Sequence, residues 1–498
     1  MIRTEIVETT LGKVQGYIEK GIKIFKGIPY AAPPIGNLRF SPPIPREPWS
    51  DIFMADKFGS IAPQPPFVSV SKQLKHSEAE CLNLNIWTPG IDQKKRPVMF
   101  WIHGGGFMYE SSADRKIDGS ALALKGNVIV VSINYRLGPL GFLYIPGITA
   151  NVGMLDQIAA LKWVRDNIRI FGGDPNNVTI FGESAGATAV VSLLAMPAAK
   201  GLFHRAIVQS YCVYYVSNQE RGSKEFISKL GFHIKDIKSL QKLPVNKLID
   251  TFAEFMEDVN QRDEVESFVP VIDDKTLPEY PLKAVSEGFS RDIPLLIGTN
   301  KDEMTINYYF LSSIPKINDD ELLNSVCKVL RKLGQNESKA KQMIKVYKDE
   351  NRGIALQDIL YRFLTDLWYR IISIRLAEAQ SNYQPHTFMY LFTWSSPDKD
   401  GTLGATHTLE IPFIFGTLNK PNMDSWTGKG KKANNLSDKM MKCWIAFAHT
   451  GNPNHKDIPK WPAYEVENRA TMNMGKKFKI LNAPFDKERA AWDGIHLS

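Results

Sequence analysis

Short apolar runs alternate with helical patterns along much of the chain. The runs are continuous and rich in β-branched or aromatic residues, which predicts buried strands. The predicted strands span residues 98–103, 127–134, 177–181, 205–210, 293–298 and 388–392. Residues 153–168 carry apolar side chains at helical spacing, and residues 185–196 form an apolar helix that ends before Pro197. Continuous apolar strands separated by helices indicate an α/β fold, with a mostly parallel central sheet and helices on both faces.

Two long stretches interrupt this alternation. Residues from about 213 to 290 and from about 304 to 385 are charged and helical, without a clear buried strand. We interpret them as helical insertions that cap the sheet. Because no internal repeat or low-complexity segment divides the chain, we predict a single domain over residues 1–498 with two cap-forming insertions.

The composition is that of a folded globular protein. The chain has 498 residues, of which 43% are hydrophobic and 23% charged, and this profile excludes a disordered, collagenous or coiled-coil protein. The formal net charge is +8, but the basic residues are spread along the chain in short clusters. Because no basic stripe is interleaved with aromatic residues, we expect no nucleic-acid partner.

Cysteine use and the N-terminal sequence favour an intracellular protein. The four cysteines are widely spaced, with no CxxC and no zinc-ligand spacing, which favours reduced thiols but leaves room for two disulfides. The N-terminal residues lack the apolar core of a signal peptide. The longest informative uncharged stretch, residues 137–155, contains two prolines and four glycines. We therefore expect a cytoplasmic protein without a membrane span, as a monomer or weak homo-oligomer.

A G-x-S-x-G sequence at residues 182–186 is the strongest sign of chemistry. It follows a predicted strand directly and opens the helix predicted at 185–196, as a nucleophile elbow requires. Side chains at Gly182 and Gly186 would collide with the neighbouring strand and helix. Ser184 would then lie at a helix N-terminus, where dipoles favour developing negative charge. We predict that Ser184 is a catalytic nucleophile; the alternative is a serine in an ordinary glycine-rich turn.

An earlier predicted strand ends in His103 and three glycines. The glycines at 104–106 would expose successive N–H groups with no side chain in the way. Together with the N–H of Ala185, they can bind the oxyanion of a tetrahedral intermediate, as in HGGG-type hydrolases. The alternative is a plain glycine loop after a strand, which the presence of the Ser184 motif makes less attractive.

The base and the acid follow from chain order, because enzymes with a nucleophile elbow place the nucleophile first, then the acid, then the histidine. Of the five histidines that follow a plausible acid loop, only His407 lies in a loop shortly after a strand. For the acid, the strand at 293–298 is followed by Asp302 and Glu303, and the spacing does not choose between them. The acid has to fix the imidazole tautomer and stabilise the imidazolium. A solvated histidine and a solvated acidic turn are the alternatives.

A longer match surrounds the serine motif. Residues 171–186 match the active-site signature of the type-B carboxylesterases, the family of carboxylesterases and cholinesterases, throughout. Segments at 26–31, 133–137 and 461–464 also match, so the resemblance covers nearly the whole chain. The chain most resembles the branch of bacterial p-nitrobenzyl esterases. This resemblance implies an α/β-hydrolase fold and a serine esterase.

Position by position, the resemblance implies a complete site. Ser184 matches the acyl-ester nucleophile, and His407 matches the base in an H-x-x-E-(L/I)-P-F segment. Glu303 matches the acid, so the resemblance favours Glu303 over Asp302. The remaining matches are oxyanion donors at Gly105, Gly106 and Ala185 and supporting groups at Ser210 and Glu410.

The chain also departs from the family pattern. The segment around Cys81 differs from the family signature, and no earlier cysteine exists to pair with it, so the cholinesterase-type loop disulfide is absent. The tryptophan that binds the ammonium of choline is missing as well, so we do not expect a choline esterase. Tyr211 after Ser210 and Met304 after Glu303 stand where the family usually has glycine. These bulky residues bear on substrate range more than on mechanism.

We therefore expect a serine carboxylesterase that hydrolyses carboxylic esters, in particular short-acyl or aryl and benzyl esters. Its partner would be a small-molecule ester, and the mechanism requires neither a metal nor a cofactor. One alternative is another serine-hydrolase chemistry at the same site, such as amide, carbamate or lipase action. A second alternative is a non-catalytic binding protein, although such relatives lack an intact triad.

Overall fold

The computed structural model describes residues 2–66, 74–212, 220–261, 268–311 and 313–497. The chain divides into two units. Unit 1 comprises Met1–Ile207 and Tyr214–Ile293, and unit 2 comprises Val208–Val213 and Pro294–Ser498. The strand β11 (Arg205–Gln209) carries the chain from unit 1 into unit 2.

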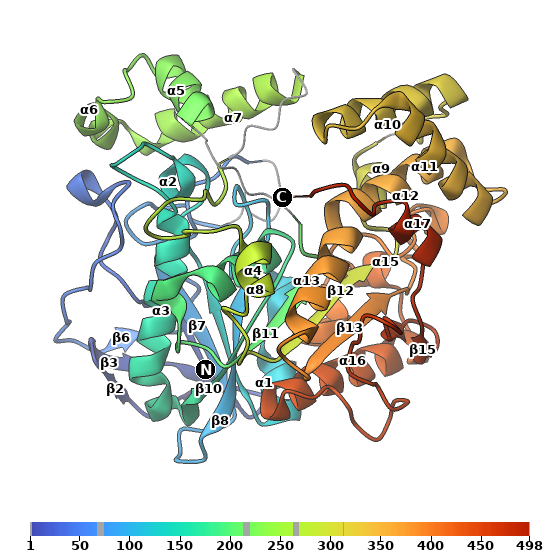
Figure 1. Ribbon diagram of the computed structural model, residues 1–498. Helices are drawn as coiled ribbons and strands as arrows, with labels where there is room; N and C mark the ends of the chain where they lie inside the picture. Colours follow the sequence, from blue (N-terminus) through green and yellow to red (C-terminus); the bar gives the residue numbers. More distant parts are fainter. Residues whose placement is uncertain (1, 67–73, 213–219, 262–267, 312, 498) are drawn as a thin grey trace. The chain divides into compact units, whose positions relative to one another are not determined.

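Unit 1 is built on a mixed sheet with strand order β1-β4-β5-β7-β9-β8-β10. Its strands are β1 (Ile2–Arg3), β4 (Tyr17–Glu19), β5 (Ile22–Pro29), β7 (Asn83–Thr88), β9 (Ile129–Ile133), β8 (Arg96–Ile102) and β10 (Gly173–Glu183). β8 runs parallel to β9 and β10, with Val98 opposite both Ile129 and Val178. Along this sheet β1 pairs antiparallel with β4, β4 with β5, β5 with β7, and β7 with β9. Because β8 and β10 are parallel neighbours, the segments that follow them leave the same edge of the sheet (Figure 1).

The inner strands of unit 1 are covered on both faces. Every residue of β8 and β9 is buried. Successive side chains of a strand point to opposite faces, so complete burial requires cover on each face. Part of this cover comes from α1 (Ser120–Gly126), which packs against β7 and β9, and from α3 (Val152–Asn167) and α4 (Ala185–Ala195), which pack against β10.

Unit 2 contains a second set of strands, β12 (Leu295–Asn300), β13 (Thr387–Phe392), β14 (Thr471–Met474) and β15 (Lys479–Leu481). β12, β13 and β14 are parallel, and β15 pairs antiparallel with β14. α13 (Ile371–Ser381) packs against β12 and β13. The ring of Tyr390 on β13 meets Trp444 of α16 (Lys431–Thr450), with centroids 5.3 Å apart. The helices α13 and α16 thus help to bury β13 completely.

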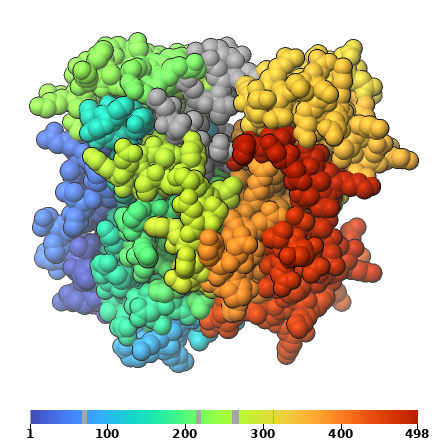
Figure 2. All heavy atoms as spheres, in the orientation of Figure 1, coloured from blue at the N-terminus to red at the C-terminus, as the bar shows by residue number. Residues whose placement is uncertain are grey.

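Helices fill the two predicted insertions. The described part of the first contains α5 (Glu220–Lys229), α6 (Ile237–Lys242), α7 (Val245–Gln261) and α8 (Pro281–Ser286). The second contains α9 (Ile306–Phe310), α10 (Asp319–Lys332), α11 (Glu337–Glu350), α12 (Leu356–Thr365), a π-helical turn at Asp366–Arg370 and α13. Residues 213–219 and 262–267 of the first insertion lie outside the described residues. Helical character is confirmed, and α10 and α11 form part of the surface of unit 2, coloured gold in Figure 2. Their role as caps of a single domain stays a prediction.

The predicted α/β fold class is confirmed. Each strand and helix predicted from the apolar runs has a counterpart; residues 98–103 correspond to β8, for example, and residues 153–168 to α3. None of the strands β1 to β7, nor β14 or β15, was predicted, and these include the longer strands β5 and β7. Three of the short ones, β2 (Val7–Thr9), β3 (Gly12–Gln15) and β6 (Phe53–Met54), form a separate three-stranded sheet. Strands of two to four residues are too short for a periodic pattern to register.

The four cysteines are buried thiols. Among the residues that the structure describes, Cys81, Cys212, Cys327 and Cys443 are buried and form no disulfide. Burial raises the pKa of the Cys81 and Cys443 thiols above the ordinary value. Since the thiolate is the reactive form, these two residues are unreactive parts of the core, as the prediction of reduced thiols implies.

Helix length and composition bear on the predicted absence of a membrane span. Within the described ranges, no helix combines the length and apolar character that crossing a membrane requires. α16 has 20 residues, which is enough length, but it contains charged residues such as Lys431 and Asp438. The cytoplasmic location and the oligomeric state stay predictions.

Candidate active site

The segment from β10 into α4 forms the tight turn that the G-x-S-x-G sequence predicts. β10 ends at Glu183, α4 begins at Ala185, and Ser184 alone connects them. Ser184 has φ 57° and ψ −123°, and a left-handed φ costs a non-glycine residue conformational energy. Only 7% of its surface is exposed. A strained serine between a strand and a helix is the geometry of a nucleophile elbow.

Two glycines allow this turn to pack closely. A Cβ at Gly182 would lie 2.5 Å from the carbonyl oxygen of Gly186 and 2.8 Å from that of Ile102 in β8. A Cβ at Gly186 would overlap the carbonyl oxygen of Ile102 and lie 2.9 Å from that of His103. Any side chain at either position would push the helix away from the strand. The predicted reason for these glycines is confirmed.

The glycine loop after β8 passes beside the nucleophile candidate. A Cβ at Gly104 would lie 3.3 Å from the Cβ of Ser184. The loop then turns back, because the N–H groups of Met108 and Tyr109 donate hydrogen bonds of 2.9 and 3.1 Å to the carbonyl oxygen of Gly105. Gly105 itself has φ 88°, a conformation that glycine adopts readily.

Three backbone donors flank this turn. Within the part of the chain that the structure describes, the N–H groups of Gly105, Gly106 and Ala185 donate no hydrogen bond to another protein group. Ala185 is the first residue of α4, where an N–H has no partner inside the helix. The three N–H groups are therefore available as donors to a negatively charged oxygen.

His103 supports the glycine loop from within the core. Its ring stacks on Tyr135 with centroids 4.5 Å apart, and its Nδ1 lies 3.0 Å from the carbonyl oxygen of Gly104. Burial lowers the pKa of His103 to about 4, so the ring is neutral at neutral pH. Because a carbonyl oxygen only accepts hydrogen bonds, Nδ1 carries the proton and donates it to Gly104.

His407 and Glu303 meet in unit 2. β12 ends at Asn300, and Glu303 opens a 3₁₀ turn at Glu303–Thr305. Nδ1 of His407 lies 2.7 Å from Oε2 of Glu303, and the N–H of His407 donates to the carbonyl oxygen of Glu303 at 3.3 Å. Glu303 is fully buried, and His407 is 8% exposed. A carboxylate that accepts from Nδ1 fixes the tautomer and orientation of the imidazole.

Asp302 makes different contacts from its neighbour. Its Oδ2 accepts a 3.0 Å hydrogen bond from the N–H of Ala405, and its own N–H donates to the carbonyl oxygen of Ala405 at 3.0 Å. These bonds tie the loop that carries His407 to the end of β12. Of the two acids that the spacing left open, the structure brings Glu303 to the histidine.

The two predicted supporting residues surround the acid. Ser210 Oγ donates a 2.6 Å hydrogen bond to Oε1 of Glu303, which also accepts from the N–H of Asn300 at 2.7 Å. Glu410 accepts from the side-chain amides of Asn300, at 2.7 Å, and Gln209, at 3.1 Å. Burial, with a further contribution from the charge of Glu303, raises the pKa of Glu410. One hydrogen-bonded group thus joins Ser210, Glu303 and Glu410.

Sequence reasoning missed three residues that contact the proposed acid, base or supporting residues, namely Gln209, Asn300 and Tyr369. Asn300 links Glu303 to Glu410, and its side-chain amide also donates a 2.7 Å hydrogen bond to the carbonyl oxygen of Thr406. Tyr369, in the π-helical turn, packs its ring against His407 with centroids 4.8 Å apart. Asn300 could have been found from the sequence, because it is a polar residue that lies at the end of a strand and close to the acid pair. No local pattern points to Tyr369, which comes from a distant part of the chain.

The bulky residue that follows the acid packs inward. Met304 lies against a cluster of Tyr308, Tyr361 and Leu403, and its N–H donates a 3.2 Å hydrogen bond to Oγ1 of Thr365. These contacts anchor the turn that carries Glu303 on α12. Tyr211, the other departure from the family pattern, is 1% exposed. The effect of both residues on substrate range stays a prediction.

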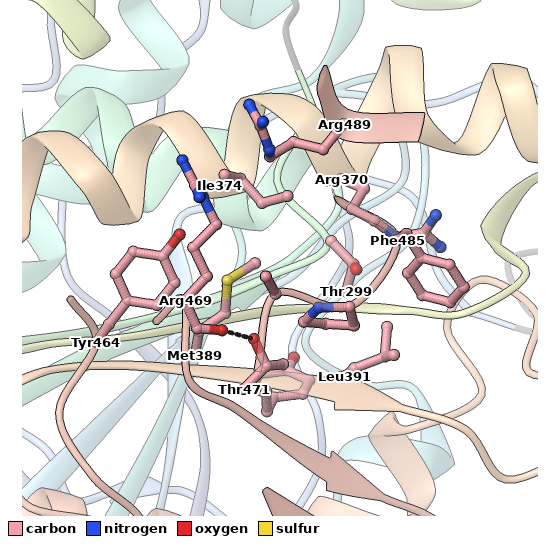
Figure 3. Close-up of a pocket in the computed structure, with 13 residues that line it drawn as sticks. Thr299, Arg370, Ile374, Met389, Leu391, Tyr464, Arg469, Thr471, Phe485 and Arg489 are labelled. Carbon is pink, nitrogen blue, oxygen red and sulfur yellow. Dashed lines mark hydrogen bonds between the residues drawn. The ribbon is translucent and has the colours of Figure 1, made fainter. Parts of the chain in front are cut away.

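Figure 3 shows a separate concavity of unit 2 whose lining includes three arginines. Thr299, Met389, Leu391 and Thr471 line it from the strands, and Thr471 Oγ1 donates a 2.9 Å hydrogen bond to the carbonyl oxygen of Arg469. Each guanidinium has a carboxylate partner; the ion pairs are Arg370–Asp366, Arg469–Glu378 and Arg489–Asp486. Because these charges are balanced within the unit, the concavity offers little surplus charge for a ligand, and it contains none of the predicted site residues.

Comparison with known proteins extends the resemblance over the chain. The chain is 39% identical over 495 residues to the para-nitrobenzyl esterase of Bacillus subtilis (strain 168), which covers 97% of this chain and 98% of that protein. It is 33% identical to the phenmedipham hydrolase of Pseudarthrobacter oxydans, with 95% of this chain and 96% of that protein covered. Both relatives therefore match it along nearly their entire length.

Solved structures and family models agree with these relatives. The fold is similar to that of a carboxylesterase from Geobacillus stearothermophilus, with a TM-score of 0.88 and 35% identity over 98% of this chain and 100% of that chain. The model of the Carboxylesterase family matches residues 3–492. The α/β-hydrolase fold expected from the resemblance is confirmed, and the chain is an enzyme that belongs to the carboxylesterase family.

Proposed function

We propose that this enzyme is a serine carboxylesterase that hydrolyses carboxylic esters through an acyl-enzyme on Ser184. His407 is the general base, and Glu303 is the acid that orients it. The oxyanion donors are the N–H groups of Gly105, Gly106 and Ala185, and the supporting residues are Ser210 and Glu410. The observation that carries the proposal is the 2.7 Å contact between the His407 ring and the buried Glu303 carboxylate.

This contact supports the proposal because the acid is itself held in place. Both oxygens of Glu303 are engaged, one by Ser210 and Asn300 and the other by His407. With Nδ1 facing the carboxylate, the nitrogen that accepts a proton is Nε2. The carboxylate then stabilises the imidazolium that forms during the reaction.

In acylation, Nε2 of His407 takes the hydroxyl proton of Ser184 while Oγ attacks the ester carbonyl carbon. The π electrons of the carbonyl move to its oxygen, which the backbone N–H groups stabilise. When the carbonyl re-forms, the bond to the alkoxy oxygen breaks and His407 gives its proton to the departing alcohol. Water then attacks the acyl-enzyme in the same way, which releases the carboxylic acid and restores Ser184.

For the substrate, we propose short-acyl or aryl and benzyl esters. The proposal is supported by the name of one relative, a para-nitrobenzyl esterase that matches nearly the whole chain. The test is a competition assay between para-nitrobenzyl and p-nitrophenyl esters of increasing acyl length. A preference for long-chain emulsified esters would contradict it.

The proposed nucleophile is tested by labelling with a fluorophosphonate, followed by peptide mass spectrometry. We expect one adduct on Ser184, and Ser184→Ala should prevent labelling and lower kcat by a factor on the order of 10⁶. Ser192→Ala is the matched control, because Ser192 is a buried serine of the same helix that donates to the carbonyl oxygen of Thr188. It should leave labelling unchanged. A folded parent protein without an adduct would remove the catalytic assignment and favour a binding protein.

A further inference from the structure

An ion pair lies directly behind the glycine loop. Nζ of Lys116 is 2.9 Å from Oε1 of Glu110 and 3.5 Å from Oδ2 of Asp114. The three side chains are between 13% and 18% exposed. Charges that are shielded from water to this extent interact more strongly than charges at the open surface.

Glu110 connects this ion pair to the loop. Its backbone has φ 77°, and the side-chain amide of Gln64 holds it on both sides. The N–H of Glu110 donates to Oε1 of Gln64 at 2.9 Å, and its carbonyl oxygen accepts from Nε2 of Gln64 at 3.0 Å. A Cβ at Gly105 would lie 3.0 Å from Cγ of Glu110. The Glu110 side chain therefore packs on Gly105, one of the proposed oxyanion donors.

A carboxylate in this place opposes the proposed chemistry unless its charge is cancelled. Negative charge develops on the substrate oxygen at the N–H of Gly105, and a nearby negative Glu110 would raise the energy of that state. Lys116 supplies the opposite charge. Burial works against the ammonium, but the facing carboxylates of Glu110 and Asp114 raise the pKa of Lys116 above its ordinary value, so it stays charged.

We propose that Lys116 is a positioning residue for ester hydrolysis, which acts by cancelling the negative charge that Glu110 carries beside the oxyanion hole. The inference rests on the proposed function, because it takes Gly105 as an oxyanion donor. It predicts an asymmetry between the two partners. Loss of Lys116 leaves a carboxylate uncompensated beside the reaction, whereas loss of the Glu110 charge leaves Lys116 with Asp114. If the ion pair were purely structural, loss of Lys116 and loss of the Glu110 charge would lower activity to a similar extent.

The test compares Lys116→Met, Lys116→Arg, Glu110→Gln and the double variant Lys116→Met/Glu110→Gln. Lys116→Met should lower kcat on the order of tenfold with little change in KM. It should weaken a trifluoromethyl ketone, whose adduct with the serine carries the same oxyanion, by a similar factor. Lys116→Arg and the double variant should recover most of the loss, and Glu110→Gln should keep kcat.

The matched control is Lys23→Met. Lys23 belongs to the same unit, its side chain is 17% exposed, and its Nζ lies 2.7 Å from Oε1 of Glu5. Removal of this second ion pair should leave both kcat and the affinity for the trifluoromethyl ketone unchanged.

Each variant is first titrated with the fluorophosphonate, which counts the reactive sites. If the parent is not labelled at Ser184, the proposed function fails, and this inference fails with it. If labelling is normal but Lys116→Met keeps kcat, the inference alone is wrong. It is also wrong if Glu110→Gln and the double variant lose as much activity as Lys116→Met. Lys116→Gln replaces Lys116→Met in this comparison if the methionine variant does not fold.

Discussion

The carboxylate of Glu303 lies 2.7 Å from the ring of His407, while the carboxylate of Asp302, the preceding residue, accepts a hydrogen bond from the backbone N–H of Ala405. Glu303 is fully buried, whereas the Asp302 side chain is 17% exposed. Two adjacent acids thus have different tasks. One faces the imidazole, and the other holds the loop on which the imidazole is carried.

Glu303→Gln should therefore impair turnover far more than Asp302→Asn. The amide removes the negative charge that stabilises the imidazolium, and a carboxylate-to-amide change in a comparable triad lowers kcat by about 10⁴. Asparagine at 302 keeps an oxygen that can accept from Ala405, so its activity should stay within a few-fold of the parent. Steady-state kinetics with a p-nitrophenyl ester provides the measurement. The opposite ranking would move the orienting role to Asp302.

Gly105→Ala should disable the proposed oxyanion hole. The new Cβ would overlap the carbonyl oxygen of Tyr109, and φ 88° is unfavourable for alanine. The loop would have to move, and loss of a single oxyanion donor typically lowers kcat by about 10²–10³. Gly201→Ala is the control, since Gly201 has φ 80° but no atom within 4 Å of the position that a Cβ would take. A Gly105→Ala enzyme with the activity of the control would show that the loop does not serve the reaction.

Activity should rise with pH through one ionisation at about pH 6–7, the usual range of a histidine base. His103 cannot supply this ionisation, because burial lowers its pKa to about 4. His103→Gln should therefore keep the midpoint of the pH profile, whatever its amplitude, whereas His407→Gln should abolish turnover. The profile of kcat/KM against pH decides between them. A midpoint that shifts with His103→Gln would contradict the assignment of His407.

The buried Glu410 predicts a dependence of stability on pH. Burial, and then the charge of Glu303, raises the pKa of Glu410 above its ordinary value of 4.5, so the folded protein binds this proton more tightly than the unfolded chain does. Protonated Glu410 therefore adds to the free energy of unfolding. This contribution is complete below the pKa that Glu410 has in the unfolded chain, and it is lost as pH rises through the pKa that it has in the folded protein. Because glutamine does not titrate, Glu410→Gln removes this pH-dependent loss of stability. Its Tm relative to the parent should therefore increase between about pH 5 and pH 8.

Thermal unfolding at both pH values measures this difference. The exposed Glu467 provides the control, because Glu467→Gln removes a carboxylate at the surface. The Tm of this variant should follow that of the parent across the same pH range. If the Tm of Glu410→Gln also follows that of the parent, the surroundings of Glu410 do not raise the pKa of its carboxyl group.

Strands such as β8 and β9 could be predicted because burial leaves a local record in the sequence, whereas β7, which is equally buried but carries two asparagines and a threonine, was not predicted. β8 and β9 are buried at every residue, and each is an apolar run apart from Arg96 at the start of β8 and Ser132 in β9. β1 offers no such record, since both of its residues are exposed and its identity depends on pairing with β4. The helical insertions were recognisable from their composition, but the positions of their helices depend on contacts between distant segments.

The same distinction applies to the site. The turn at Ser184 is made by consecutive residues, so the sequence alone predicts its geometry. The choice between Asp302 and Glu303 depends on the direction of each side chain after β12, which spacing does not encode; on the sequence, only the family resemblance favours Glu303. Tyr369 had no motif at all, because its contact with His407 arises from packing between distant segments. Glu110 and Lys116 are only six residues apart, but no motif marks the way in which their loop folds back to pair them.

The backbone conformation of Ser184 lowers stability, whereas in the proposed mechanism its hydroxyl is required for turnover. Its φ of 57° is costly for serine and free for glycine, so Ser184→Gly would release strain of about 1–3 kcal/mol while removing the hydroxyl. A variant library screened only for survival at high temperature would therefore favour glycine at this position and enrich proteins without a nucleophile. Only a screen that rewards product formation would keep the serine.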